Sequence, residues 1–170
     1  MFHAGFMLTA SGPVVLEYNC RFGDPEAQAL LPLLDTDLLD IFQACINGGL
    51  DADKVRWKEH LHACAVVCAP SGYPSLHATG HVIHGLDDAR RLENVIVYHG
   101  GTACRSVEAK HGERNGVATP SAFEVVTTGG RTLAITGIGT TVRQAVQAAY
   151  LGVSKVSFQN MHTRTDIAHR

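Results

Sequence analysis

Residues 14–28, VVLEYNCRFGDPEAQ, are the stretch that most constrains what this chain can fold into. An apolar run leads into polar side chains at every second position, Glu17, Asn19 and Arg21, and then breaks at residues 23–25, Gly-Asp-Pro. Residues two apart on a β-strand point to the same face. The pattern therefore predicts a strand that presents three polar side chains on one face and ends in a turn.

The polar residues of this stretch suit the binding of a cation and an anion. A carboxylate beside an amide oxygen suits Mg²⁺, which takes one or two protein oxygens and completes its octahedron with water and phosphate oxygens, so Glu17 and Asn19 are candidate metal ligands. Arg21 carries a forked donor suited to phosphate or carboxylate, and Asp24 can accept from hydroxyls or an amine. Spacing alone leaves an alternative open, an exposed strand face on which Glu17 and Arg21 form a weak surface ion pair.

The run EYNCRFGDPEAQ resembles the signature of the phosphoribosylamine–glycine ligases, also called glycinamide ribonucleotide synthetases, which are ATP-grasp enzymes of purine biosynthesis. The segment RFGDPE, residues 21–26, is the specific part of the resemblance. The pair Glu17 and Asn19 is similar to the metal-binding pair of ATP-grasp enzymes in general. The resemblance implies Mg²⁺ or Mn²⁺ on these two residues, with ATP as a substrate.

The resemblance also implies a reaction and a role for each site residue. ATP phosphorylates the carboxylate of glycine, and the amine of 5-phosphoribosylamine attacks the glycyl phosphate to give glycinamide ribonucleotide, ADP and phosphate. Arg21 is expected to bind the anionic substrate or intermediate, and Asp24 the ribosylamine side. Gly23 is expected to let the backbone approach the substrate.

Four further motifs extend the resemblance through the second half of the chain. They are Ser71-Gly72-Tyr73-Pro74, His99-Gly100-Gly101-Thr102, Gly129-Gly130-Arg131-Thr132-Leu133-Ala134 and Thr165-Asp166-Ile167. They are similar to the C-terminal domain of the same family, which is a small sheet with a packed helix. The resemblance thus covers nearly all of this chain but only the last part of the enzyme.

The expected fold class is α+β, with residues 1–60 as the end of an ATP-grasp lobe and residues 61–170 as a small antiparallel sheet domain. The first part should contain a β-hairpin of strands 3–9 and 14–19, then helices at 26–34 and from 38 to Gly48, the second capped by Asp35 or Thr36. Further strands are expected at 63–69, 81–84, 95–99, 122–127, 132–136 and 156–158, with a helix after Thr140 or Thr141.

Composition excludes several classes of protein. The 170 residues are 45% hydrophobic and 18% charged with a formal charge of −2, which gives no electrostatic footprint for nucleic acid. No apolar run approaches the roughly 20 residues that cross a bilayer, and no signal peptide is apparent. Five cysteines without a Cys-x-x-Cys pair favour reduced thiols and a cytoplasmic protein. Cys64 and Cys68, near His62, lack zinc-knuckle spacing and are interpreted as core residues.

Two departures from the family pattern shape the functional hypothesis. Residues 104–121 are longer and more polar than the expected hairpin turn and predict a surface loop. The first strand lacks a carboxylate, and Lys54 and Lys58 are the only lysines in the first part of the chain. We therefore expect the phosphate-clamping lysines, glycine-rich flap and adenine pocket upstream of Met1 or on a partner chain, and expect these 170 residues alone to be inactive.

Two alternatives remain open from the residues. Another ATP-grasp enzyme, such as a carboxylase subunit, would share Glu17, Asn19 and Arg21, although the Gly-Asp-Pro-Glu continuation argues against it. The chain could instead be a non-catalytic accessory or assembly module. The lack of upstream lysines favours that second alternative for the isolated chain.

Overall fold

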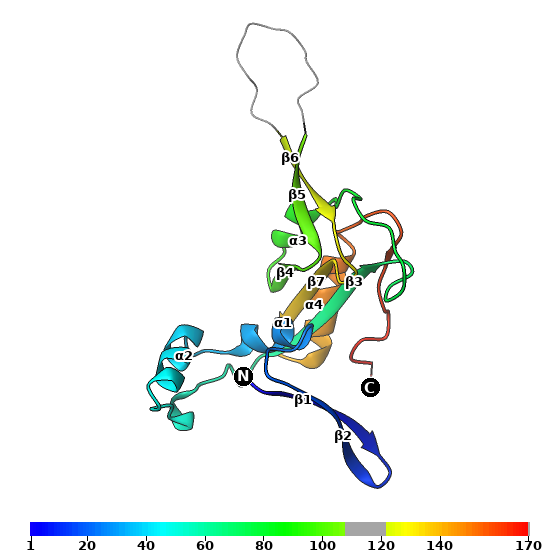
Figure 1. The fold of residues 1–170 in the computed structure, drawn as a ribbon. Helices are drawn as coiled ribbons and strands as arrows, with labels where there is room; N and C mark the ends of the chain where they lie inside the picture. The colour runs from blue at the N-terminus through cyan, green and yellow to red at the C-terminus, as the bar shows by residue number, and fades with distance from the viewer. Residues whose placement is uncertain (108–121, 170) are drawn as a thin grey trace, which may run out of the picture. The chain divides into compact units, whose positions relative to one another are not determined.

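The computed structural model describes residues 1–107 and 122–169. The chain divides into two compact units, Met1–Leu61 (unit 1) and His62–Arg170 (unit 2). Figure 1 shows the elements of each unit along the chain. None of the helices in the described part of the chain has the length and apolar character needed to span a bilayer.

Unit 1 begins with an antiparallel hairpin of β1 (His3–Thr9) and β2 (Gly12–Asn19). The predicted hairpin is confirmed, and β2 starts two residues before the predicted position. Its register places His3 opposite Asn19 and Gly5 opposite Glu17, with a shift between Gly5 and Phe6. Such a shift is typical of a β-bulge, which increases the local twist of the strands.

The helices of unit 1 are shorter than predicted. α1 (Glu26–Leu30) passes into a 3₁₀ turn at Leu31–Leu33, where Pro32 lies in the first turn. Because proline has no N–H to continue the α-helical ladder, the predicted helix over 26–34 ends early. α2 (Leu38–Ile46) follows, and a second 3₁₀ turn lies at Ala52–Lys54.

The predicted cap of α2 was wrong. Asp37 caps this helix, with its side chain accepting from the Leu39 N–H at 2.8 Å. Thr36 Oγ1 instead accepts from the Arg56 N–H at 2.7 Å, and Asp35 lies 3.5 Å from the Arg56 guanidinium. Contacts with the connector after α2 therefore decide which of three adjacent polar residues caps the helix.

Unit 1 buries little of its own side-chain surface. Of residues 1–61, all of which are described, Gly23 is the single buried residue. Large apolar side chains are exposed on the hairpin, α2 and the connector; they include Phe6, Met7, Leu8, Val14, Leu16, Tyr18, Leu39, Ile46, Leu50 and Trp57. Exposed apolar surface on this scale is typical of a surface that contacts another part of a protein rather than solvent.

Unit 2 is built on a four-stranded antiparallel sheet in the order β4-β7-β3-β8. These strands are β3 (His62–Pro70), β4 (Val95–His99), β7 (Leu133–Gly139) and β8 (Met161–His162). A separate hairpin pairs β5 (Thr102–Val107) with β6 (Ala122–Thr127), and the helices are α3 (Leu86–Arg90) and α4 (Val142–Val153). The predicted small antiparallel sheet with a packed helix is confirmed.

α4 packs closely on β7, and this contact forms the centre of the core of unit 2. Ile135 on β7 and Ala145 and Ala149 on α4 are completely buried. A side chain at Gly137 would collide with the backbone of Ala145 and Ala149, so glycine permits the helix to lie directly on the strand. The helix begins at Thr141, whose Oγ1 accepts from the Gln144 N–H at 3.2 Å, which confirms the predicted cap.

Three local predictions in unit 2 were wrong, and one helix was not predicted. Residues 81–84 make only isolated bridges, Val82 with Val126 and His84 with Ser157, and that second bridge is all that forms at 156–158. α3 was not predicted, because its sequence LDDAR is short and charged. Residues 104–107 belong to β5 rather than to a loop. The rest of that predicted loop, 108–121, lies outside the described residues.

Candidate metal and substrate site

Glu17 and Asn19 lie side by side near the end of β2, as the alternation predicts. Asn19 Nδ2 donates to Glu17 Oε1 at 3.1 Å. This hydrogen bond holds the two side chains together and leaves the Asn19 Oδ1 and the Glu17 Oε2 outside it as oxygen acceptors. Glu17 is exposed and Asn19 is half-buried.

This donor set fits a hard divalent cation. A carboxylate oxygen and an amide oxygen are the ligands Mg²⁺ and Mn²⁺ prefer, and Mg²⁺ commonly uses only one or two protein groups. Within residues 1–107 and 122–169, no three His, Cys, Asp or Glu side chains gather as a metal cluster. Cys64 and Cys68 are buried in the core of unit 2, and burial raises the pKa of the Cys68 thiol to about 12.

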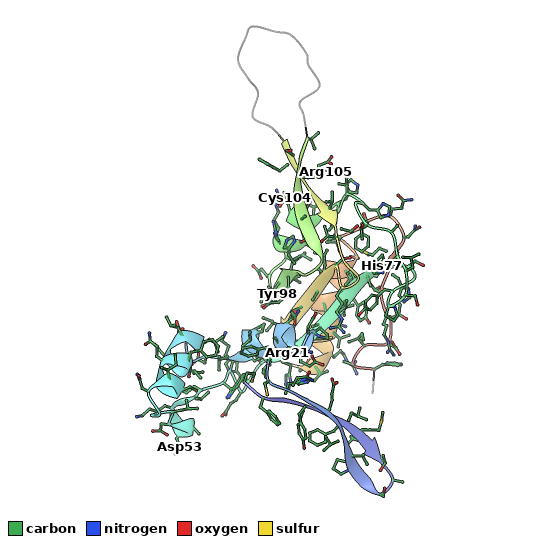
Figure 2. The ribbon with its side chains drawn as sticks, viewed as in Figure 1. Arg21, Asp53, His77, Tyr98, Cys104 and Arg105 are labelled. Carbon is green, nitrogen blue, oxygen red and sulfur yellow. The ribbon has the colours of Figure 1, made fainter. Side chains whose placement is uncertain are left out.

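Arg21 does not share the strand face of Glu17 and Asn19, so that part of the prediction was wrong. β2 ends at Asn19, and Arg21 lies in the bend that follows. Its Nη1 donates to the backbone carbonyl of Phe22 at 2.9 Å (Arg21 is labelled in Figure 2). No Glu17–Arg21 ion pair forms in the described chain, so the alternative of a cross-face pair is also wrong.

The Gly23-Asp24-Pro25 turn is tied to the start of α1. The Gly23 carbonyl accepts from the Ala27 N–H at 3.0 Å, and Gln28 Nε2 donates to Asp24 Oδ1 at 3.0 Å. A Cβ at Gly23 would lie 2.9 Å from Cδ of Glu26, so a side chain here would displace the Glu26 carboxylate. A larger residue at position 23 would therefore require the Glu26 side chain to move.

Two further polar side chains lie at this site, and the sequence analysis did not single them out. His3 is opposite Asn19 in the hairpin register, and its Nε2 lies 3.9 Å from Oε1 of Glu26 on α1. His3 Nδ1 is buried and has no hydrogen-bond partner. The predicted turn at 10–13 would have placed Ala4 across from Asn19, whereas the observed turn and the register shift between Gly5 and Phe6 place His3 there.

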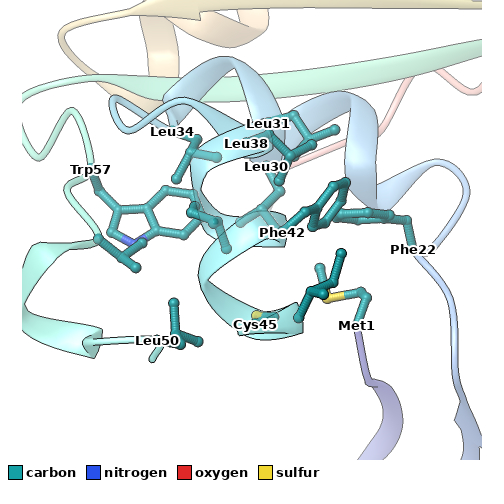
Figure 3. A pocket seen from close by; sticks show the side chains of 13 residues that line it. Met1, Phe22, Leu30, Leu31, Leu34, Leu38, Phe42, Cys45, Leu50 and Trp57 are labelled. Carbon is teal, nitrogen blue, oxygen red and sulfur yellow. The ribbon is translucent and has the colours of Figure 1, made fainter. Parts of the chain in front are cut away.

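An apolar pocket of about 640 Å³ lies within unit 1, next to the Arg21–Gly23 bend (Figure 3). Phe22 lines it and faces Phe42 of α2, with ring centroids 6.4 Å apart. Other lining residues come from the N-terminus, both helices and the connector, namely Met1, Leu30, Leu31, Leu34, Leu38, Ile41, Cys45, Ile46, Leu50, Val55 and Trp57.

Three signature motifs of unit 2 meet at one end of its sheet. The Gly100 and Gly101 N–H groups donate to the carbonyls of Thr132 and Arg131 at 3.0 and 2.8 Å. Arg131 Nε donates to the Tyr73 hydroxyl at 3.0 Å. The motifs containing Tyr73, His99 and Arg131 therefore form one packed loop cluster.

Two family models match this chain, one in each unit. Residues 63–170 match the family described as "Phosphoribosylglycinamide synthetase, C domain", and residues 1–27 match "Phosphoribosylglycinamide synthetase, ATP-grasp (A) domain". The chain belongs to the phosphoribosylglycinamide synthetase family. The resemblance noted in the sequence is thereby confirmed.

Individual members of the family resemble nearly the whole chain. It is 45% identical over 165 residues to the bifunctional purine biosynthetic protein ADE1 of Schizosaccharomyces pombe, a match that covers 97% of this chain and 18% of that protein. It is 39% identical over 166 residues to the phosphoribosylamine–glycine ligase of Caldanaerobacter subterraneus, covering 98% of this chain and 35% of the ligase. The chain thus spans about a third or less of the length of these relatives.

A solved structure of the family has the same fold. The crystal structure of phosphoribosylamine–glycine ligase from Thermotoga maritima superposes with a TM-score of 0.72 at 30% sequence identity. The match covers 98% of this chain and 36% of that ligase. The α+β fold class is therefore shared with a synthetase of known structure.

Proposed function

We propose that this chain is the part of a phosphoribosylamine–glycine ligase that supplies the metal pair and the C-terminal domain. With an ATP-grasp region like that of its longer relatives, it would join glycine to 5-phosphoribosylamine, forming glycinamide ribonucleotide, ADP and phosphate through a glycyl phosphate. The observation that carries this proposal is the hydrogen-bonded Glu17–Asn19 pair, in which each side chain keeps an oxygen outside the shared hydrogen bond, placed directly before the family's RFGDPE turn. Family matches over both units support this proposal rather than an accessory module or a carboxylase.

Glu17 and Asn19 are the residues that would hold Mg²⁺ or Mn²⁺. A bound cation would neutralise phosphate charge during phosphoryl transfer from ATP. The task of the protein is to present two oxygens in a fixed relation, and the 3.1 Å hydrogen bond between the two side chains supports that assignment. Replacing either oxygen donor should weaken the affinity for metal.

Arg21, Gly23 and Asp24 are assigned to the substrates. Only Nη1 of Arg21 is used by the Phe22 carbonyl, and the guanidinium carries further donors that suit a phosphate or carboxylate. We assign Asp24 to the ribosylamine side, where its carboxylate can accept from hydroxyl or amine groups. Gly23, which is buried and has no side chain, would bring the backbone close to the substrate.

The exposed apolar surface of unit 1 supports a role within a longer enzyme. We assign residues 1–60 to the ATP-grasp lobe and residues 61–170 to the C-terminal domain. Apolar side chains on the hairpin and on α2 would be covered by the remainder of the ATP-grasp lobe, which would also supply the lysines that clamp ATP. We further propose a cytoplasmic location, consistent with five unpaired cysteines.

The decisive experiment measures phosphate release that depends on ATP, glycine, Mg²⁺ and 5-phosphoribosylamine. The 170-residue chain would be assayed alone and after fusion to the upstream region of the Caldanaerobacter subterraneus ligase. Activity in the fusion and none in the isolated chain is the expected result. A folded fusion without activity would overturn the proposal.

Glu17→Gln in the active fusion tests the metal assignment. The substitution keeps the shape and removes the charge, so we expect kcat/KM to fall about 100-fold and the Mn²⁺ concentration for half-maximal rate to rise. Glu59→Gln, at an exposed position in the connector, is the matched control and should leave both values unchanged. Full turnover and unaltered metal dependence in Glu17→Gln would refute the assignment.

A further inference from the structure

His99, in the signature motif His99-Gly100-Gly101-Thr102, takes no part in the proposed chemistry. Both nitrogens of its imidazole nevertheless make hydrogen bonds. His99 is the last residue of β4. Its Nε2 lies 2.7 Å from Nη2 of Arg90, the last residue of α3. Its Nδ1 lies 3.0 Å from Oγ1 of Thr102, the first residue of β5. One side chain therefore joins three elements of unit 2.

The partners determine where the ring carries its proton. An arginine guanidinium can only donate hydrogen bonds, so the His99 Nε2 must be the acceptor from Arg90. The single proton of the neutral ring then lies on Nδ1, which donates to the Thr102 hydroxyl oxygen. The arrangement requires the neutral Nδ1–H tautomer, because a second proton on Nε2 would face a cationic donor.

Among residues 1–107 and 122–169, no carboxylate forms an ion pair with His99, and the charge that acts on its ring is that of Arg90. On α3, Asp87 lies 3.8 Å from Arg90, and on the hairpin Glu124 is taken by Arg105 at 2.8 Å. Across the sheet the residue opposite His99 is Leu133. The remaining charged or titratable groups on or beside these elements are Asp88 on α3, Arg91 directly after α3, Tyr98 on β4, Cys104 on β5 and Arg131 before β7 (Tyr98 and Cys104 are labelled in Figure 2).

We propose that His99 is a pH-sensitive latch that holds the end of α3 to β4 and β5 while its ring is neutral and releases Arg90 when the ring is protonated. The proton comes from solvent and adds to Nε2, which ends the Arg90 N–H to Nε2 hydrogen bond. Nδ1–H continues to donate to Thr102. The released segment is short, since Leu86 and Ala89 keep α3 anchored in the core.

The direction of the pH effect follows from the same contacts. Partial burial, and then the charge of Arg90, lower the pKa of His99 from its usual 6.5. The unfolded chain therefore takes up this proton before the folded chain does as the pH falls. The contribution of the latch to stability is complete above pH 6.5 and declines as the pH falls from 6.5 toward the lowered pKa.

Ring ¹⁵N–¹H correlation spectra of the ¹⁵N-labelled 170-residue chain between pH 8 and 4.5 test the latch, with amide exchange of residues 86–91 as the second readout. We expect an Nδ1–H pattern for His99 at pH 7.5, a midpoint below 6.5, and, once the ring is protonated, faster exchange in α3 relative to the intrinsic amide exchange rate at the same pH. An Nε2–H pattern, a midpoint at or above 6.5, or titration without any change in α3 exchange would overturn the proposal.

Two variants separate the latch from general acid destabilisation. Arg90→Gln removes the cation and should raise the midpoint of His99, whereas Arg91→Gln is the matched control, because Arg91 pairs with Asp88 at 3.4 Å, and should not move it. His99→Gln keeps an acceptor for Arg90 and should make the protection factors of the α3 amides independent of pH in this range. An equal shift in both arginine variants would show a nonspecific charge effect and refute the latch. The inference does not depend on the proposed ligase activity.

Discussion

Unit 2 and unit 1 differ in how many of their apolar side chains are buried. Unit 2 completely buries Val66, Cys68 and Ile135, whereas the single buried residue of unit 1 is Gly23. Full burial of one large aliphatic side chain stabilises a fold by roughly 1.5–3 kcal/mol, and an isolated two-stranded hairpin is marginal in water. Unit 2 therefore provides its own stability, while unit 1, which carries the candidate site, leaves most of its apolar surface available for contacts.

The difference also separates structural from functional positions. Substitutions in unit 2 should change the free energy of unfolding. Substitutions at the candidate site in unit 1 should change activity of the longer enzyme while leaving the stability of this chain nearly intact. The following measurements test that separation.

Thiol reactivity should show the largest contrast. Cys20 and Cys45 in unit 1 are exposed, whereas Cys68 in unit 2 is completely buried and has a pKa of about 12. Since the thiolate is the reactive form, Cys68 should react with an aromatic disulfide reagent at pH 8 about 1000-fold more slowly than the exposed thiols. Stopped-flow absorbance on single-cysteine variants measures the rates. In denaturant the contrast should vanish, and equal rates in the native chain would contradict the buried core.

Gly137→Val should be the most damaging substitution for stability. The added side chain would meet the α4 backbone, with the Ala148 carbonyl carbon 2.9 Å from the Cβ position, and helix backbone cannot move aside cheaply. We expect a loss of about 3 kcal/mol or failure to fold. Urea unfolding followed by circular dichroism measures it. Gly49→Ala in unit 1, where nothing lies within 4 Å, is the control and should change stability by less than about 0.5 kcal/mol.

The same substitution placed in each unit gives a direct comparison of the two. Ile135→Ala removes a fully buried side chain and should cost about 2–5 kcal/mol, whereas Ile46 is 84% exposed and Ile46→Ala should cost less than about 0.5 kcal/mol. Urea midpoints at constant m-value report both changes. If Ile46→Ala were as destabilising as Ile135→Ala, unit 1 would have a core of its own in solution.

Arg21→Lys should have the smallest effect on the fold and a clear one on activity. Lysine keeps the charge but lacks the forked donor, so we expect about a tenfold lower kcat/KM in the active fusion and a change in unfolding free energy below about 0.5 kcal/mol. Steady-state kinetics and urea unfolding measure the two quantities. The control is Arg56→Lys in the connector, where Arg56 pairs with Asp35 on the surface, and its kinetics should match the unsubstituted protein. Unaltered kinetics in Arg21→Lys would remove Arg21 from the site.

The side-chain alternation along β2 was sufficient to predict the Glu17–Asn19 pair, because strand geometry has an exact period of two. The same alternation was extended to Arg21, two residues past the predicted strand end at Asn19, where the chain bends and the period of two no longer applies. Arg21 was misplaced for that reason. His3 was missed because its proximity is a property of cross-strand register rather than of neighbouring sequence.

Sequence reasoning succeeded for long periodic elements and failed for short ones. The cap of α4 was correctly limited to Thr140 or Thr141 because a sustained apolar stripe follows them, and the structure shows that Thr141 is the cap. Asp37 was not identified as the cap of α2, because Asp35 and Thr36 offer the same chemistry and are distinguished from it only by their contacts with Arg56. Val156 and Phe158 alternate like strand residues, but their burial in the core needs no ladder around Ser157.

The strand order of unit 2 sets when its sheet can be completed during synthesis. β7 lies between β4 and β3 in the sheet, although both of those strands precede it in the chain. While the ribosome translates the residues between β4 and β7, the apolar edges of β3 and β4 have no partner. Nascent chains stalled before Leu133 should therefore remain protease-sensitive, and we expect this interval to be the one in which a chaperone protects the domain from aggregation.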